Sequence, residues 1–414
     1  MTRSQTQFED GESIEIESGA LSPEQIAPLL NKLGSHLPYS IPLVRRIQFY
    51  LHHPISPTAR IFVAAVVESR GGQGHVDGLS DEARDGTGDS GELDLWLLEP
   101  QSRKHPWITA HVDLAFAGQT AVWVYGSWES DLEDPMPSSL ADSMEALELT
   151  HAEPHPTRKA LMRVLFDYIS VELIPLRPTS PSEEWLGLER TGKYLSKPYS
   201  RDKVLFGTVS EKLWALFPRE ARTRTDPDYW KYIFKVDSKP QRQVEGRDSN
   251  VPVPSLPAGY SFGVMKDENL QMVLDRTPIP RTLNTLRQFV SVGLFHESSQ
   301  IPIGWGFLGK DASLSSLHTE PEHRGKGLAV ALGAELLRKQ HITTSSDDGQ
   351  ERGGREGGEI NGQVKGEGGF TWAHADVSKN NKASLRVMEK LGGKPTWMVM
   401  WTEVNMSEVL SATQ

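Results

Sequence analysis

After residue 257, apolar positions follow two regular spacings. Short apolar or alternating runs predict strands, and apolar residues three to four positions apart predict helices. Strands are predicted over Tyr260–Val264, Ser291–His296, Ile303–Leu308, Ser313–Thr319, Phe370–Val377 and Thr396–Val404. Helices are predicted over Glu268–Asp275, Thr282–Phe289, Gly327–Gln340 and Asn381–Leu391. In the third helix Leu328, Leu332 and Leu336 share one face, which we expect to pack against a sheet.

The same criteria predict an α/β unit in the first half of the chain. Ile61–Val67 is a β-branched apolar run, typical of a buried strand. Further strands are predicted over Leu93–Leu98, Trp107–Val112 and Ala121–Tyr125, and helices over Leu21–Leu33, Ile41–Leu51, Ser138–Leu149 and His155–Ser170. From Trp185 to Asp237 aromatic and charged residues mix without a clear period, and we predict short helices there.

Four segments lack any core-forming pattern, and they divide the chain. Residues 1–20 are predicted to be a disordered tail, 69–92 and 341–369 Gly-rich disordered insertions, and 238–257, with four prolines, a linker. This predicts an N-terminal α/β lobe over 21–237, a second domain over 258–404, and a tail over 405–414. The four segments carry ten of the eleven net negative charges, so the acidity says little about the folded parts.

Composition narrows the possible chemistry. The absence of cysteine from all 414 residues excludes disulfides, thiolate metal sites and a cysteine nucleophile. A net charge of −11 argues against nucleic-acid or anionic-membrane partners. There is no apolar run of about 18 residues and no apolar segment at the N-terminus, so we predict neither a membrane span nor a secretory signal. We expect a cytoplasmic protein without a metal site; nothing predicts its oligomeric state.

The segment from Thr319 to Ala329, TEPEHRGKGLA, lies where a predicted strand passes into a predicted helix. Gly325 and Gly327 allow unusual backbone angles, and Arg324 and Lys326 add positive charge. A helix N-terminus also presents unpaired N–H groups and a partial positive charge. Together these features suit a pyrophosphate. On these residues alone, an ordinary strand–helix turn with solubilising charges is an equally good interpretation.

A second segment makes the resemblance specific. RGKGLA, from Arg324 to Ala329, resembles the Arg/Gln-x-x-Gly-x-Gly/Ala signature of the GNAT superfamily of acyl-CoA N-acyltransferases. VSKNNKASLRVMEKLG, from Val377 to Gly392, resembles the superfamily's Asn-x-x-Ser/Ala…Tyr-Glu-Lys-Leu-Gly-Phe helix. The match covers residues 258–404. WAHADV before the second motif and LPYSI, from Leu37 to Ile41, are similar to the glycine N-acyltransferase-like branch.

The resemblance implies a fold and a cofactor site. The fold class is α/β: a GNAT-type mixed, mostly antiparallel sheet flanked by helices, with an N-terminal lobe that is a candidate degenerate copy. Acyl-CoA would enter where the strands Ser313–Thr319 and Phe370–Val377 part. Backbone groups near Leu317 and Thr319 would pair with the pantetheine amides. The implied pyrophosphate site comprises Arg324, Gly325, Lys326, Gly327, Leu328 and Ala329; Asn381 would cap the next helix or reach the cofactor.

The catalytic assignment departs from the family pattern. Met388 stands where many relatives have a tyrosine that protonates the CoA thiolate, and methionine has no proton to donate. Ser313 and Ser315 stand where relatives often have a glutamate or histidine base, and Gly393 replaces a phenylalanine. Ser384, as a donor or water holder, and His374, on a cleft strand, are the candidate catalytic residues. Helix packing for Ser384 and a hydrogen-bonded structural role for His374 are the favoured alternatives.

The leading functional hypothesis is an N-acyltransferase. It would transfer an acyl group, with acetyl the first candidate, from acyl-CoA to an amine of a small molecule or amino acid, by direct attack in a ternary complex. The expected partners are therefore acyl-CoA and an amine acceptor. The departures at Met388, Ser313 and Ser315 motivate a second hypothesis, a non-catalytic acyl-CoA-binding protein or scaffold with a degenerate GNAT site.

Overall fold

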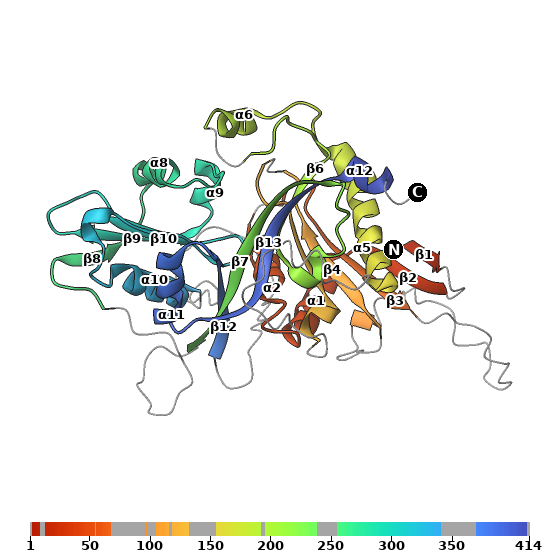
Figure 1. Cartoon of the computed structure of the whole chain (residues 1–414), viewed down its shortest axis with the longest axis horizontal. Helices are drawn as coiled ribbons and strands as arrows, with labels where there is room; N and C mark the ends of the chain where they lie inside the picture. Colours follow the sequence, from red (N-terminus) through yellow and green to blue (C-terminus); the bar gives the residue numbers. More distant parts are fainter. Residues whose placement is uncertain are drawn as a thin grey trace.

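The computed structural model describes residues 2–8, 13–53, 55–67, 96–97, 105–115, 118–131, 155–191, 195–237, 255–340 and 370–411. Its strands form one 13-stranded sheet in the order β1-β2-β3-β4-β5-β6-β13-β7-β12-β11-β10-β9-β8. The pairs β5–β6 and β11–β12 are parallel, and the other neighbours are antiparallel. This confirms the predicted fold class, a mostly antiparallel mixed sheet with flanking helices (Figure 1).

The N-terminal lobe contains the first half of the sheet. Its strands are β1 (Thr2–Gln7), β2 (Ser13–Ala20), β3 (Arg60–Val67), β4 (Trp107–Val112), β5 (Val122–Gly126) and β6 (Lys203–Ser210). Its longer helices are α1 (Ile26–Gly34), α2 (Ile41–Leu51), α5 (Pro156–Tyr168) and α6 (Glu183–Arg190), followed by the short α7 (Glu211–Trp214). One cluster of buried apolar residues joins α1 and α2 to the sheet, and a second joins α5 to it. Because strand side chains alternate between faces, both faces are covered.

The C-terminal lobe contains the other half. Its strands are β8 (Tyr260–Gly263), β9 (Val290–His296), β10 (Gly304–Leu308), β11 (Leu314–Thr319) and β12 (Phe370–Ser378), and its helices are α8 (Asp267–Arg276), α9 (Leu283–Arg287), α10 (Leu328–Lys339) and α11 (Lys382–Lys390). On β10, Trp305 and Phe307 join a buried cluster with α8 and α9, whereas Leu308 joins one with α10. The two pairs of helices therefore cover opposite faces, as Figure 1 shows.

The two lobes exchange strands in the middle of the sheet. The long β7 (Arg222–Asp237) follows β6 in the chain but pairs with β12 of the C-terminal lobe. In return, β13 (Lys394–Asn405) follows α11 but pairs with β6 of the N-terminal lobe. β7 and β13 also pair with each other, so they cross the molecule side by side (Figure 1). The segment predicted to separate two domains at 238–257 thus follows a strand that already belongs to both halves.

Several predicted elements need correction. Residues 2–7 and 13–20 form strands rather than a disordered tail, because Ile16 is buried against α5 and β2 pairs along β3. The region 185–237 forms α6, α7 and two long strands rather than short helices alone. Trp96 and Leu97, predicted as strand, are helical, and the predicted tail 405–414 contains α12 (Met406–Ser411), whose Val409 is fully buried.

Other predictions fall on residues that the structure does not describe. These are the insertions 69–92 and 341–369, the helix over 138–149 and most of the linker. Within the described residues, none of the helices has both the length and the apolar character needed to cross a membrane.

Candidate functional site

The strands β11 and β12 part soon after they meet. They share one residue pair, Leu314 with Ala375. Beyond it, β11 pairs with β10 and β12 pairs with β7. Ser316 lies at the divergence with a left-handed φ of 51°, and the register between β10 and β11 shifts there. A bulge of this kind bends a strand away from its neighbour, so the backbone from Leu317 to Thr319 faces an open gap.

The loop after β11 leaves its amide groups available. Gly325 and Gly327 have φ values of 80° and 79°, in the region that favours glycine, and α10 begins directly after them. The N–H groups of residues 325–329 have no hydrogen-bond acceptor among the described residues, and no side chain caps α10. A Cβ added at either glycine would meet no atom within 4 Å. The loop therefore presents a row of free donors at a helix N-terminus, an arrangement that suits a phosphate group.

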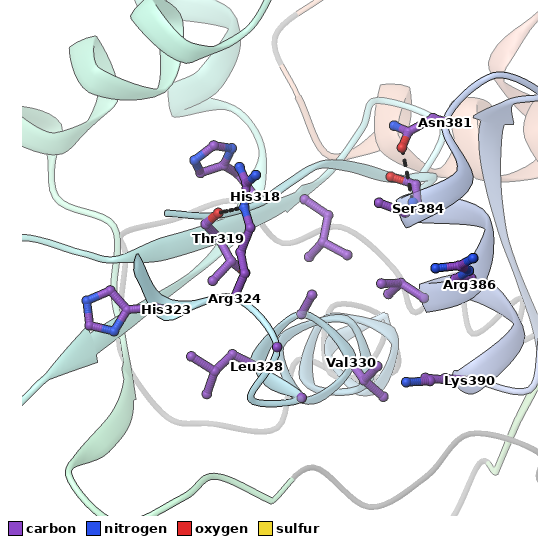
Figure 2. Close-up of a pocket in the computed structure, with 16 residues that line it drawn as sticks. His318, Thr319, His323, Arg324, Leu328, Val330, Asn381, Ser384, Arg386 and Lys390 are labelled. Atoms are coloured by element: carbon purple, nitrogen blue, oxygen red, sulfur yellow. Dashed lines mark hydrogen bonds between the residues drawn. The ribbon is translucent and has the colours of Figure 1, made fainter. Parts of the chain in front are cut away.

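A pocket of about 540 Å³ lies between β11, this loop, α10 and α11 (Figure 2). Among the residues that the structure describes, its lining includes three positively charged side chains, Arg324, Arg386 and Lys390, and no carboxylate. Figure 2 shows Arg386 and Lys390 on α11, across the pocket from Arg324. Arg324 is held in place by a hydrogen bond of 2.9 Å from its Nε to the Thr319 carbonyl. The pocket is therefore electropositive and suits a polyanionic ligand.

The structure brings most of the predicted site residues together in this pocket. The lining contains Leu317, Thr319, Arg324, Gly325, Gly327, Leu328, Ala329, Asn381 and Ser384. Lys326 is the exception among the predicted cofactor residues, since its Nζ donates to Tyr260 Oη at 2.8 Å outside the lining. Asn381 caps α11, because its Oδ1 atom accepts a hydrogen bond of 3.1 Å from the Ser384 N–H. Capping is one of the two roles anticipated for Asn381.

His374 does not reach the pocket. It is fully buried on β12, with its Nε2 atom 2.8 Å from the Asp311 carbonyl and its Nδ1 atom 3.3 Å from Lys231 Nζ. Burial, together with the charge of Lys231, lowers the pKa of His374 to about 4 despite the opposing carboxylates of Asp311 and Asp376. The imidazole is therefore neutral at pH 7 and held by hydrogen bonds, as in the structural role favoured for it.

The surroundings of His374 resemble a cation site. Ligand atoms of Asp311, His374 and Asp376 lie within 4.8 Å of one another. Lys231 Nζ, however, is 2.5 Å from Asp376 Oδ1 and also donates to Thr208 Oγ1 at 2.6 Å. The lysine ammonium thus already supplies a positive charge to this group, which joins β6, β7 and β12. We therefore interpret the cluster as a structural contact at the junction of the two lobes.

Sequence reasoning missed the cations on α11. Arg386 and Lys390 are four residues apart, so they share a helix face, and both are exposed. That spacing next to the Asn381 cap was the available signal. Sequence reasoning also missed the surroundings of His318, which stacks on Trp305 with ring centroids 4.5 Å apart and lies 3.5 Å from the Glu320 carboxylate.

The N-terminal lobe contains a similar parting of strands, but its gap is filled. The parallel strands β5 and β6 share one residue pair, Val122 with Phe206. A 3-10 turn (Ser127–Ser130) follows β5 directly and buries Trp128 and Glu129. The Glu129 carboxylate accepts from the Gly126 N–H at 2.8 Å and bonds Ser210 at the end of β6. Burial raises the pKa of Glu129 to about 7, although these bonds and Lys212 oppose the shift.

Comparison with known proteins gives a family match. The family model described as acyl-CoA N-acyltransferase verG N-terminal domain matches residues 13–232, more than half of the chain. No curated protein matches the sequence.

Solved structures also resemble the chain, at low identity. A Drosophila protein from a structural genomics consortium is 13% identical, with a TM-score of 0.48, and a tandem GNAT protein from the clavulanic acid biosynthesis pathway is 12% identical, with a TM-score of 0.40; in both, 94% of this chain and 98% of the other are covered. A putative GNAT-family acetyltransferase from Novosphingobium aromaticivorans is 16% identical over 49% of this chain and 73% of its own, with a TM-score of 0.30.

Proposed function

Since this chain belongs to the acyl-CoA N-acyltransferase family whose model covers more than half of it, we propose that it transfers an acyl group from acyl-CoA to an amine bound at the gap between β11 and β12. The observation that carries the proposal is the row of unpaired amides at residues 325–329, which opens into an electropositive pocket beside that gap. Family membership supports the reaction class, and the pocket supports the place where acyl-CoA binds.

In the proposed complex, the CoA pyrophosphate accepts from the amides at the start of α10. Arg386 and Lys390 face the phosphate groups from α11, and no carboxylate among the described lining residues competes for them. The pantetheine lies along β11, where the backbone of Leu317 and the N–H of Thr319 offer amide partners; the Thr319 carbonyl already accepts from Arg324 Nε. This places the thioester toward Leu314 and Ala375, where the strands meet.

The reaction then requires a neutral amine at the thioester carbonyl. The amine nitrogen attacks the carbonyl carbon, a C–N bond forms, the C–S bond breaks, and one proton passes from the amine nitrogen to the departing thiolate. Most of the acceleration comes from holding the two substrates together. Ser384, in the pocket lining, is the proposed donor or water holder for this proton, whereas Met388 is buried in the core and has no proton to give. Acetyl is the proposed acyl group.

The test is thiol release from acetyl-CoA and longer acyl-CoAs over a panel of amines, with acyl-CoA binding measured separately by calorimetry. Replacing both pocket cations, Arg386→Ala with Lys390→Ala, should weaken CoA binding about 100-fold or more, since each of the two charged hydrogen bonds contributes roughly 1.5–3 kcal/mol. The matched control is Lys382→Ala, an exposed cation on the same helix outside the lining, which should leave binding unchanged. Failure of the wild-type chain to bind any acyl-CoA would overturn the proposal.

A second candidate function follows from the interior of the site. Met388 is buried where a proton donor would be expected, and His374 lies outside the pocket. These observations favour an acyl-CoA-binding protein without turnover. Tight CoA binding with no thiol release over the whole amine panel would support this alternative against the enzyme.

A further inference from the structure

The proposed reaction lacks a base at the two positions where GNAT proteins often carry one. Ser313 Oγ donates to Asp311 Oδ1 at 2.6 Å, and Ser315 Oγ accepts from Nη2 of Arg281, just before α9, at 2.6 Å. Both hydroxyls are therefore engaged, and serine is not among the side chains that act as general bases. An acceptor that arrives as an ammonium ion must lose a proton before it can attack, so another residue at the gap has to accept it.

His318 lies on the same face of β11 as Ser315. On the neighbouring strand β10, Ser315 is paired with Phe307 and His318 with Trp305, and both partners belong to the buried cluster under α8 and α9. Directly paired residues project to the same face of a sheet. Ser315 and His318 therefore both face α8 and α9 although they are three residues apart, because the bulge at Ser316 adds one residue to the strand.

His318 also borders the gap between β11 and β12. It belongs to the lining of the pocket and directly follows Leu317, which lies beside the proposed pantetheine. Figure 2 shows the ring of His318 and α10 on opposite sides of β11. Acyl-CoA occupies the α10 side in the proposed complex, so an acceptor that leaves the cofactor in place approaches from the α8–α9 side. The imidazole of His318 therefore lies on the side from which the acceptor amine would come.

Two contacts hold the ring of His318. It stacks on Trp305 with ring centroids 4.5 Å apart and an angle of 18° between the planes. Its Nε2 atom is buried and lies 3.5 Å from the carboxylate of Glu320, which lies in turn 3.3 Å from Nε of Arg276 at the end of α8. A carboxylate favours the tautomer whose proton is on the nitrogen that faces it. Nδ1 has no partner among the described residues, so its lone pair is free to accept a proton.

We infer that His318 is the base that takes a proton from the ammonium group of the acceptor, with Glu320 as its positioning residue. This inference rests on the proposed function and adds the base that the function lacks. The first proton passes from the acceptor nitrogen to Nδ1 of His318, directly or through one water, and leaves a neutral amine. That amine attacks the thioester carbon, the C–N bond forms, the C–S bond breaks, and a second proton passes from nitrogen to the thiolate. The imidazolium, stabilised by Glu320, then releases the first proton to water.

The experiment compares the best alkylamine of the acceptor panel with its β,β-difluoro analogue. At about pH 8 the alkylamine is protonated, as a lysine side chain is, whereas fluorine withdraws charge and leaves the analogue mostly neutral. His318→Phe keeps a ring on Trp305 but removes both nitrogens. It should lower kcat/KM for the alkylamine about 100-fold and for the analogue less than about threefold, because only the first needs a general base. Calorimetric binding of acyl-CoA should stay unchanged.

Two further variants complete the design. Glu320→Gln removes the carboxylate that orients His318 and should give a smaller loss, again confined to the alkylamine. It carries the test if the His318→Phe protein does not fold. The matched control is His296→Phe, at a histidine of the same sheet that contacts Tyr260 with ring centroids 4.8 Å apart and lies outside the lining. It should leave the kcat/KM of both amines unchanged.

The outcomes separate this inference from the proposed function. If His318→Phe slows both amines equally, or neither, His318 only supports the fold and the inference is overturned, while the acyltransferase stays in place. The same holds if Glu320→Gln leaves the ratio of the two amines at its wild-type value. Absence of acyl-CoA binding by the wild-type protein overturns the proposed function itself. Tight binding without turnover of any amine overturns the base and supports the acyl-CoA-binding alternative.

Discussion

The two lobes contain the same strand arrangement with opposite outcomes. In each, two neighbouring parallel strands share one residue pair and then part: β5 with β6, and β11 with β12. In the C-terminal lobe a long loop with two left-handed glycines follows the strand, and the gap leads to a pocket of about 540 Å³. In the N-terminal lobe a short turn follows at once and places Trp128 and Glu129 inside. Two strands that part can therefore leave a pocket between them. The residues that follow the first strand of the pair decide whether the gap stays open or is filled.

The largest effect is expected from emptying the filled gap. Trp128 is 2% exposed and packs against Gly126, at which an added Cβ would lie 2.6 Å from the indole. Trp128→Ala should lower the free energy of unfolding by about 3–5 kcal/mol, because it removes a large buried ring and leaves a cavity. Chemical denaturation measures this. Ile55→Ala, at a side chain that is 65% exposed, should cost less than about 0.5 kcal/mol. A similar, small cost for both would mean that Trp128 does not hold the lobe closed.

The next effect concerns the charge in the same gap. The pKa of Glu129 is raised to about 7 from 4.5, so the folded state keeps this proton when the unfolded chain has lost it. This contribution to stability is full below pH 4.5 and is lost as pH rises through 7. Glu129→Gln keeps the carbonyl acceptor for Gly126 but has no proton to lose. Its stability relative to wild type should therefore rise by about 2–3 kcal/mol between pH 5 and pH 8.

Denaturation curves of both proteins at the two pH values test this difference. The pKa of His374 is lowered, so its effect on the free energy of unfolding has the opposite direction. The folded protein loses this stability as pH falls from 6.5 to about 4. It is present in both proteins, so its effect cancels in the comparison. A Glu129→Gln difference that does not change with pH would contradict the assignment of a buried, uncharged carboxyl group in the N-terminal gap.

The smallest effect on stability is expected from a substitution in the open gap. Its main expected effect is on the binding of acyl-CoA. Gly327→Ala should cost about 1–2 kcal/mol, because an L-residue is strained at φ 79° even though the added Cβ meets no atom. The same methyl group would project among the free amides and should weaken acyl-CoA binding about tenfold. Gly187→Ala, inside helix α6, is the control and should be neutral or stabilising by roughly 0.5–1 kcal/mol, with binding unchanged. Equal acyl-CoA affinity in all three proteins would argue against the α10 N-terminus as the phosphate site.

Local sequence patterns predicted the C-terminal lobe well because its elements follow simple periods. The predicted helix Gly327–Gln340 is α10 within one residue at each end, and the predicted strand Phe370–Val377 is β12 less its last residue. The family match covers residues 13–232, outside both motifs of this lobe, and it shows the acyl-CoA N-acyltransferase family that those motifs resemble. Loop glycines and the Asn381 cap are local features, so the sequence exposes them directly.

Features that depend on partners far along the chain were missed. The sequence of β7 is charged and aromatic because the strand lies between two others and buries Lys231 against Asp376. No local sequence pattern reveals this ion pair or these neighbours. Arg281 looks like one more surface arginine until β11 is placed beside it. The residues 13–20 contain only a short alternation, at Ile14 and Ile16, and they form a strand because β3 provides a neighbour. Periodicity identifies a strand by its own side chains, whereas its neighbours are set by the whole sheet.

The exchange of β7 and β13 bears on how this chain can reach its fold. β6 gains its second neighbour only from residues 394–405, so the N-terminal half of the sheet stays incomplete during synthesis until almost the whole described chain has been made. Contacts between residues so distant in sequence are slow to form. We therefore expect one late, cooperative folding step for both halves, with the free edges of β6 and β7 exposed to chaperones or to unwanted strand pairing before it.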